Sequence, residues 1–190
     1  MTRILEKTAT QQMPMTTTVE IGPVPAADTV LCAGIGAPVG LIDVIGVHIP
    51  LRERRGGLPK LETQEGLLRR MCEAARPTIV CGDFNSPKAE SLEGIVTPFA
   101  GPRSGRFREA ELALMGATNR AGMRDLFRAR HGYDRDGRSW FWKNRGRTDG
   151  YRLDHLFASE GFHVVDCDYV HDWRERGLSD HAPIWIQIRD

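Results

Sequence analysis

One short stretch, residues 78–87, constrains the fold of this chain more than any other. It begins with an apolar run typical of a buried strand, and the run stops at Gly82, where a continuing strand would carry a β-branched residue. Asp83 and Asn85 are therefore expected at the C-terminal end of a strand. Positions i and i+2 of extended backbone point the same way, so we expect a carboxylate and an amide in one cleft, with Phe84 facing the interior. These residues are also common turn formers, and a simple turn closed by the following Ser-Pro is the alternative interpretation.

Two further motifs lie near the C-terminus. Residues 152–159 read Arg-Leu-Asp-His-Leu-Phe-Ala-Ser, and residues 178–184 read Leu-Ser-Asp-His-Ala-Pro-Ile. Together with Gly-Asp-Phe-Asn at residues 82–85, and in this order, they resemble the endonuclease/exonuclease/phosphatase superfamily. The spacing, and the Ser-Trp-Phe-Trp run at residues 139–142, is most similar to the exonuclease III and abasic-site endonuclease branch. Any one motif is weak, whereas three in order are strong.

The resemblance implies both a fold and a set of roles. The implied fold is α/β (α+β), a four-layer αββα sandwich of two mixed sheets. By resemblance, Asp83 activates water and Asn85 contacts phosphate, and both contribute to the metal site. Asp154 and His181 form a dyad, and Asp180 binds the metal.

The chemistry of the same residues agrees with these roles. Hydrolysis of a phosphodiester needs a divalent cation, a base or orienting group for water, and donors for the charge on the non-bridging oxygens. Asp83 is the natural base, Asn85 offers an amide N–H to the transition state, and Asp180 supplies a hard oxygen ligand that Mg²⁺ accepts. An imidazole needs an orienting carboxylate, which Asp154 could provide for His181. We therefore expect Mg²⁺ as the cofactor, with Mn²⁺ as an alternative.

The sequence departs from the family pattern in two places. His48 follows a strand-like run where many members carry a His that donates to phosphate or acts as an acid, but the exonuclease III branch typically has Tyr there; a structural role is the alternative. Family members also carry an early Asn and a Glu that is the principal metal ligand, whereas the first asparagine here is Asn85 and neither Glu6 nor Glu20 lies in a matching motif. We therefore expect the N-terminal strands to be missing and an exposed sheet edge to permit self-association.

Length and composition predict one domain. The chain has 190 residues, 41% hydrophobic and 27% charged, which is enough for one core. Residues 1–18 show no apolar period and are expected to be a frayed end, with a partial domain over residues 19–190. No run approaches the roughly 18 apolar residues of a membrane span, and no signal peptide is evident. We expect a cytoplasmic protein without membrane contact or an obligate protein partner, with its four cysteines reduced and buried.

Charge is unevenly distributed along the chain. The net charge is +1, yet residues 103–152 hold 13 Lys and Arg against 6 Asp and Glu. This basic block contains the aromatic run at residues 140–142, and positive charge beside exposed aromatics suits a phosphate backbone with unstacked bases. DNA is the expected partner, with Trp142 and Arg152 as substrate-binding residues. A solvated arginine face over core aromatics is the alternative.

Periodicity predicts the remaining elements. Strands are expected at residues 19–21, 29–35, 41–49, 151–158, 163–170 and 184–188, and helices at residues 61–75, 108–115 and 122–130. On the 151–158 strand, His155 would point away from Asp154 and pack behind the site.

Three functions compete at this stage. The first is a metal-dependent phosphodiester hydrolase of the exonuclease III type acting on DNA. The second is a truncated, inactive family member that only binds nucleic acid. The third keeps the hydrolase but changes the substrate to a phospholipid or inositol phosphate head group.

Overall fold

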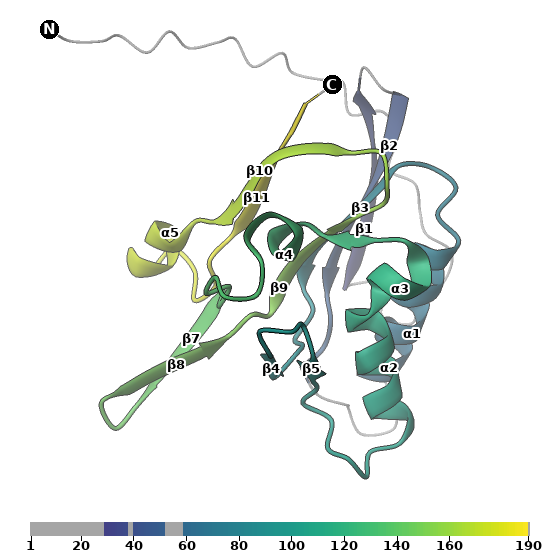
Figure 1. Ribbon diagram of the computed structural model, residues 1–190. Helices are drawn as coiled ribbons and strands as arrows, with labels where there is room; N and C mark the ends of the chain where they lie inside the picture. Colours follow the sequence, from purple (N-terminus) through teal and green to yellow (C-terminus); the bar gives the residue numbers. More distant parts are fainter. Residues whose placement is uncertain (1–28, 38–39, 52–58, 190) are drawn as a thin grey trace, which may run out of the picture.

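A computed structural model describes residues 29–37, 40–51 and 59–189. Its central element is a five-stranded sheet in the order β1-β2-β3-β9-β6 (Figure 1). The strands are β1 (Val30–Ala37), β2 (Gly40–His48), β3 (Thr78–Asp83), β9 (Asp154–Ala158) and β6 (Arg124–Asp125). Only β2 and β3 are parallel neighbours, and all other neighbours are antiparallel. The sheet is therefore mixed, as expected.

Three helices cover one face of this sheet: α1 (Pro59–Cys72), α2 (Arg106–Met115) and α3 (Ala117–Ala121) (Figure 1). The sheet residues that point toward them alternate along each strand, as a half-buried strand requires. Ile45 and Val47 of β2 and Val80 of β3 pack with Leu67 of α1 and Leu114 of α2 in one buried cluster. The sheet and helix faces thus bury each other's apolar side chains.

The opposite face carries a second sheet, the hairpin of β10 (His163–Tyr169) and β11 (Ile184–Arg189). A second buried cluster lies between the two sheets and includes Ile42, Ile79, Leu156 and Cys167. Helix α4 (Leu126–His131) contacts both β9 and β10, and α5 (His171–Glu175) follows β10. The expected α+β architecture with two packed sheets is confirmed.

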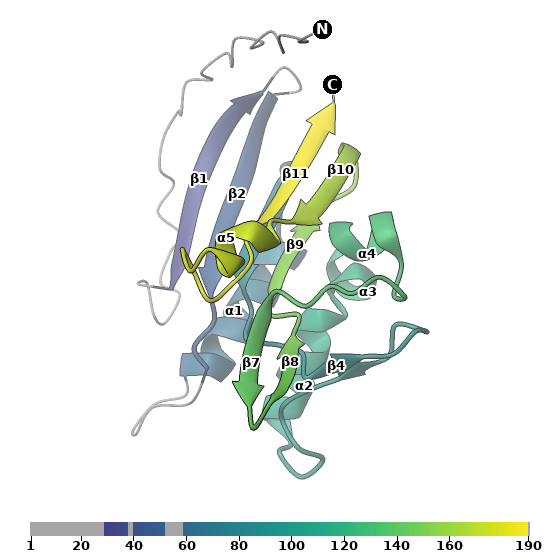
Figure 2. The same cartoon turned by 90° about the vertical axis from the view of Figure 1, so that its left-hand side faces the viewer.

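Two smaller hairpins complete the described chain. One is β4 (Ala89–Glu90) with β5 (Val96–Thr97), and the other is β7 (Trp140–Asn144) with β8 (Arg147–Tyr151). The β7–β8 hairpin extends away from the rest of the chain in Figure 1, and in the view turned by 90° it runs downward below α5 (Figure 2). Its base is joined to the C-terminal part of the chain by a bridge between Trp140 and His181.

Two predicted elements are wrong in detail. The helix expected at residues 122–130 begins only at Leu126, because Arg124 and Asp125 pair with β9 and the Asp125 side chain caps the helix by accepting the backbone N–H of Arg128. The strand expected at residues 151–158 is two strands, since β8 ends at Tyr151 and β9 begins at Asp154.

Other predictions concern residues outside the described part. The frayed end at residues 1–18 and the strand at residues 19–21 both lie there.

Within the described part, the second sheet has two strands and β11 pairs with β10 alone, so self-association through a sheet edge stays a prediction. The cysteines are free, as expected, but Cys72 is exposed and only Cys167 is fully buried. In the described part of the chain, the helices are too short or too polar to cross a bilayer.

Candidate active site

Three adjacent strands bring three of the predicted residues to one level. His48 ends β2, Asp83 ends β3 and Asp154 begins β9, and the strand register pairs His48 with Asp83 and Asp83 with Asp154. Gly82 permits the close contact between β3 and β2 at this point, because its φ is +133° and a Cβ there would lie 2.0 Å from the carbonyl oxygen of Val47. The apolar strand that stops at a glycine therefore delivers Asp83 to the mouth of the sheet.

Asn85 follows Asp83 in a conformation that few side chains adopt, with φ +46°. Its backbone N–H donates to Asp83 Oδ1 at 2.8 Å, and its amide Nδ2 donates to the Ile49 carbonyl at 2.8 Å and to Asp83 Oδ2 at 3.2 Å. Both amide hydrogens are thus occupied inside the protein, and the expected N–H for a transition state is not available. Phe84, which lies between Asp83 and Asn85 in the sequence, is fully buried, as predicted.

The predicted dyad is assembled. His181 Nδ1 lies 2.7 Å from Asp154 Oδ2, although 27 residues separate them. This hydrogen bond raises the pKa of His181 above its usual value, while partial burial acts in the opposite direction. A hydrogen bond through Nδ1 leaves Nε2 as the nitrogen that can exchange a proton with a ligand.

Asp83 completes a compact group with this dyad. One ligand atom from each of Asp83, Asp154 and His181 lies within 4.8 Å of the others, an arrangement able to hold a metal ion. Burial raises the pKa of Asp83, the hydrogen bond from the Asn85 N–H lowers it, and the nearby Asp154 carboxylate raises it again. His48 Nε2 lies 3.7 Å from Asp83 Oδ2 on an exposed side chain, at the solvent side of the same group.

Asp180 and Trp142 lie outside this group. Asp180 is exposed and accepts a hydrogen bond from Trp140 Nε1 at 3.2 Å. It is not among the described residues that form the metal-capable group. Trp142 is half-buried in β7, opposite Asp149.

Arg152 is placed differently from the prediction. Its side chain is inside the protein, with the residue 6% exposed, and it donates to Glu90 at 2.8 and 2.9 Å and to Asp125 at 2.5 and 3.3 Å. A guanidinium occupied by two carboxylates in the interior has no surface left for a substrate. The assignment of Arg152 to substrate binding is therefore corrected: it is a structural cation.

Other arginines of the basic block at residues 103–152 are also paired with carboxylates. The pairs are Arg106 with Glu65, Arg128 with Glu90, Arg130 with Asp166, Arg135 with Asp168, and Arg138 with Asp136 and Asp149. These pairs favour the alternative interpretation, in which much of the block stabilises the fold.

Three residues support the site from inside the protein, and of these only His155 was given that role from the sequence. His155, expected to pack behind the site, is fully buried and contacts the carbonyl oxygen of Ser86 at 2.7 Å. Tyr169 donates its hydroxyl to the Asp154 carbonyl oxygen at 2.5 Å. Ser139 accepts two backbone N–H groups beside Asp154. The only sequence signal for Ser139 was its place before the aromatic run, which was interpreted for its aromatics alone.

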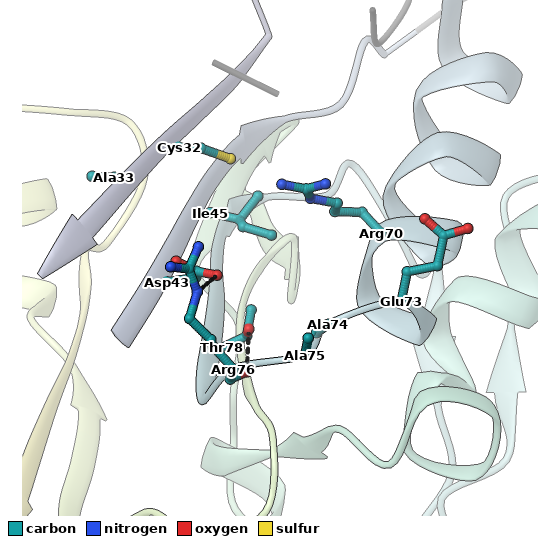
Figure 3. Close-up of a pocket in the computed structure, with 10 residues that line it drawn as sticks. All are labelled: Cys32, Ala33, Asp43, Ile45, Arg70, Glu73, Ala74, Ala75, Arg76 and Thr78. Carbon is teal, nitrogen blue, oxygen red and sulfur yellow. Dashed lines mark hydrogen bonds and ion pairs between the residues drawn. The ribbon is translucent and has the colours of Figure 1, made fainter. Parts of the chain in front are cut away.

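A separate pocket of about 370 Å³ lies between β1, β2 and the end of α1 (Figure 3). Its charged lining consists of Arg70, Glu73 and an ion pair in which Arg76 Nε lies 3.0 Å from Asp43 Oδ2. None of the predicted site residues lines it. The candidate active site is thus the open mouth of the sheet and not this pocket.

Comparison with known proteins agrees with this architecture. The chain matches the endonuclease/exonuclease/phosphatase family over residues 12–181. Similar solved structures include an AP endonuclease from Archaeoglobus fulgidus, with a TM-score of 0.60, 20% identity, and coverage of 94% of this chain and 71% of that one. An endonuclease/exonuclease/phosphatase family protein from Leptotrichia buccalis has a TM-score of 0.56 and 17% identity, and the match covers 85% of this chain and 54% of that one. TDP2 from D. rerio, complexed with a single strand DNA product, has a TM-score of 0.58 and 15% identity, and the match covers 85% of this chain and 61% of that one. No curated protein matches.

The fold and the family match together indicate a superfamily whose members are hydrolases of the phosphodiesterase or nuclease type. Two packed sheets present carboxylates and a carboxylate-paired histidine at one edge, and the family match covers most of the sequence. This chain belongs to the endonuclease/exonuclease/phosphatase family. The predicted superfamily is confirmed.

Proposed function

We propose that this chain is a divalent-metal-dependent phosphodiester hydrolase of the exonuclease III type that acts on DNA. The observation that carries the proposal is the meeting of Asp83 with the Asp154–His181 pair, whose ligand atoms lie within 4.8 Å of one another. Two of the similar structures are described as an AP endonuclease and as TDP2 with a single strand DNA product, which supports DNA as the substrate class.

Asp83 is the base or orienting group for the attacking water. Its raised pKa increases its affinity for a proton, as a base requires, while the Asn85 N–H keeps the carboxylate fixed in direction. His181 donates from Nδ1 to Asp154, so its Nε2 can hold or deliver a proton at a phosphate oxygen. His48, at the exposed edge, is a further donor toward the same phosphate.

The residues present fit a hard divalent cation. The carboxylates of Asp83 and Asp154 are the oxygen ligands that Mg²⁺ prefers, and few protein ligands are typical of sites that also use substrate phosphates. When bound, Mg²⁺ or Mn²⁺ would neutralise the charge that develops on the phosphate. Asp180, and Asn85 through its side-chain oxygen, stay as predicted additional ligands.

The decisive experiment compares Asp83→Asn with the unchanged chain on a duplex oligonucleotide containing one abasic site, with Mg²⁺ or Mn²⁺. We expect cleavage to fall by about 100-fold or more, because general-base catalysis contributes about 10²–10⁴. Chelation by EDTA should abolish cleavage, and added metal should restore it. Glu73→Gln, at the remote pocket, is the matched control and should cleave normally.

Three outcomes would overturn or change the proposal. Cleavage retained in a folded Asp83→Asn chain contradicts the role of Asp83. Salt-sensitive DNA binding without turnover at any metal concentration indicates an inactive nucleic-acid-binding member. Turnover of an inositol or lipid phosphate without DNA cleavage changes the substrate and keeps the chemistry.

A further inference from the structure

Ser139 lies where the two halves of the dyad are held. It is fully buried in the segment just before β7, and neither the aromatic run nor the proposed chemistry gives it a role. Its hydroxyl oxygen accepts the backbone N–H groups of Leu153 and Asp154, each at 3.1 Å. One side chain therefore satisfies both donors at the start of β9.

The backbone of Ser139 reaches the other half of the dyad. Its carbonyl oxygen accepts the N–H of Ala182, the residue after His181, at 2.8 Å, and its own N–H donates to the Tyr151 carbonyl at 3.0 Å. The next residue, Trp140, bridges to His181 itself. Ser139 thus contacts the segments that carry Asp154 and His181, which are 15 and 42 residues away along the chain.

The hydroxyl also compensates for the break between β8 and β9. Strand pairing of β8 ends at Tyr151, so the N–H groups of Leu153 and Asp154 need another acceptor in an interior where unpaired donors are costly. A serine oxygen has two lone pairs and can accept both. On the far side, the Tyr169 hydroxyl donates to the Asp154 carbonyl, so the backbone of Asp154 is held from two directions.

We propose that Ser139 is a positioning residue for the Asp154–His181 pair, with its hydroxyl setting the direction from which the Asp154 carboxylate meets the imidazole. The hydroxyl is fully buried, and it acts through the Asp154 backbone and not on the substrate. For its kinetic consequence this inference rests on the proposed function. Its structural consequence, a correctly placed hydrogen bond between Asp154 and His181, does not.

The first test is kinetic and uses Ser139→Ala in the full chain. Small displacements of catalytic groups cost up to about 100-fold in rate, so we expect kcat on the abasic duplex to fall by about 10- to 100-fold with KM within about twofold. Ser139→Thr keeps the acceptor oxygen and should restore kcat. Where Ser139→Ala does not fold, Ser139→Cys, a weaker acceptor of similar size, takes its place.

Ser91 offers a matched control. Its hydroxyl oxygen also accepts two backbone N–H groups, from Glu93 and Ile95 at 3.2 Å each, in the β4–β5 connection. Ser91→Ala removes the same kind of hydrogen bonds and should leave kcat unchanged. A fall in kcat in Ser91→Ala equal to that in Ser139→Ala would overturn the positioning role, because the effect would then be one of general stability.

The second test needs no turnover. The Nδ1 proton shared with Asp154 should give a downfield proton resonance in the unchanged chain, and Ser139→Ala should weaken or remove it while Ser91→Ala keeps it. If the unchanged chain cleaves nothing, the proposed function fails and this resonance alone decides the role of Ser139. A resonance and a kcat both preserved in folded Ser139→Ala would refute the inference.

Discussion

Replacement of Arg152 tests whether its guanidinium stabilises the fold or binds the substrate. The guanidinium donates four hydrogen bonds to Glu90 and Asp125 from a side chain that is 5% exposed. After Arg152→Met, Glu90 keeps its ion pair with Arg128 at 2.7 Å. Asp125 loses its close cation, since His155 Nδ1 is 3.7 Å from it.

The expected loss is large because one charge stays buried without its partner. Breaking a buried ion pair from one side costs about 3–5 kcal/mol, whereas a domain has about 5–15 kcal/mol of total stability. With a urea slope of about 2 kcal/mol/M, the midpoint of unfolding should fall by about 1.5–2.5 M. Adding Asp125→Asn removes the orphaned charge and should recover part of the loss.

Urea titration followed by circular dichroism measures these midpoints. Arg106→Met is the control, because its ion pair with Glu65 is largely exposed and such pairs contribute about 0–1 kcal/mol. An unchanged midpoint in Arg152→Met, together with a raised KM for DNA, would refute the structural role and restore the substrate-binding interpretation.

Three further predictions concern stability. Burial by itself would raise the pKa of Glu90 and of Asp125, but the Arg152 guanidinium holds both below their usual values. The contribution of these two carboxylates to stability is therefore complete above their unfolded pKa values of about 4. It is lost as the pH falls through their folded pKa values. Urea titrations from about pH 6 to pH 3 should show a decline in the free energy of unfolding, and Asp125→Asn should make this decline smaller. Gly82→Ala should cost at least about 2 kcal/mol, because its Cβ would meet backbone at 2.0 Å, and a melting temperature equal to that of Gly46→Ala, where the nearest atoms are 3.9 Å away, would contradict this. Phe84→Ala should cost about 3–5 kcal/mol as a fully buried aromatic, and a loss below about 1 kcal/mol in calorimetry would show that the cavity collapses.

The sequence determined much of the candidate site by itself. Strand periodicity and the glycine just before the last residue of β3 place Asp83 at the mouth of the sheet, and these are local properties of a few consecutive residues. The Asp154–His181 contact was predictable from two short motifs, because their residue types are chemically complementary even though 27 residues separate them. The two-sheet fold followed from the same motifs through resemblance.

Only the tertiary structure decided which polar groups face each other inside the protein. Arg152 lies between two strands, where no periodicity predicts its direction, and its partners Glu90 and Asp125 are 62 and 27 residues away. The amide of Asn85 turned inward for a similar reason, since its acceptor is the Ile49 carbonyl on another segment. Buried donors and acceptors must be satisfied by whatever the folded chain brings near them, and that pairing is set by packing over long sequence separations and not by local sequence.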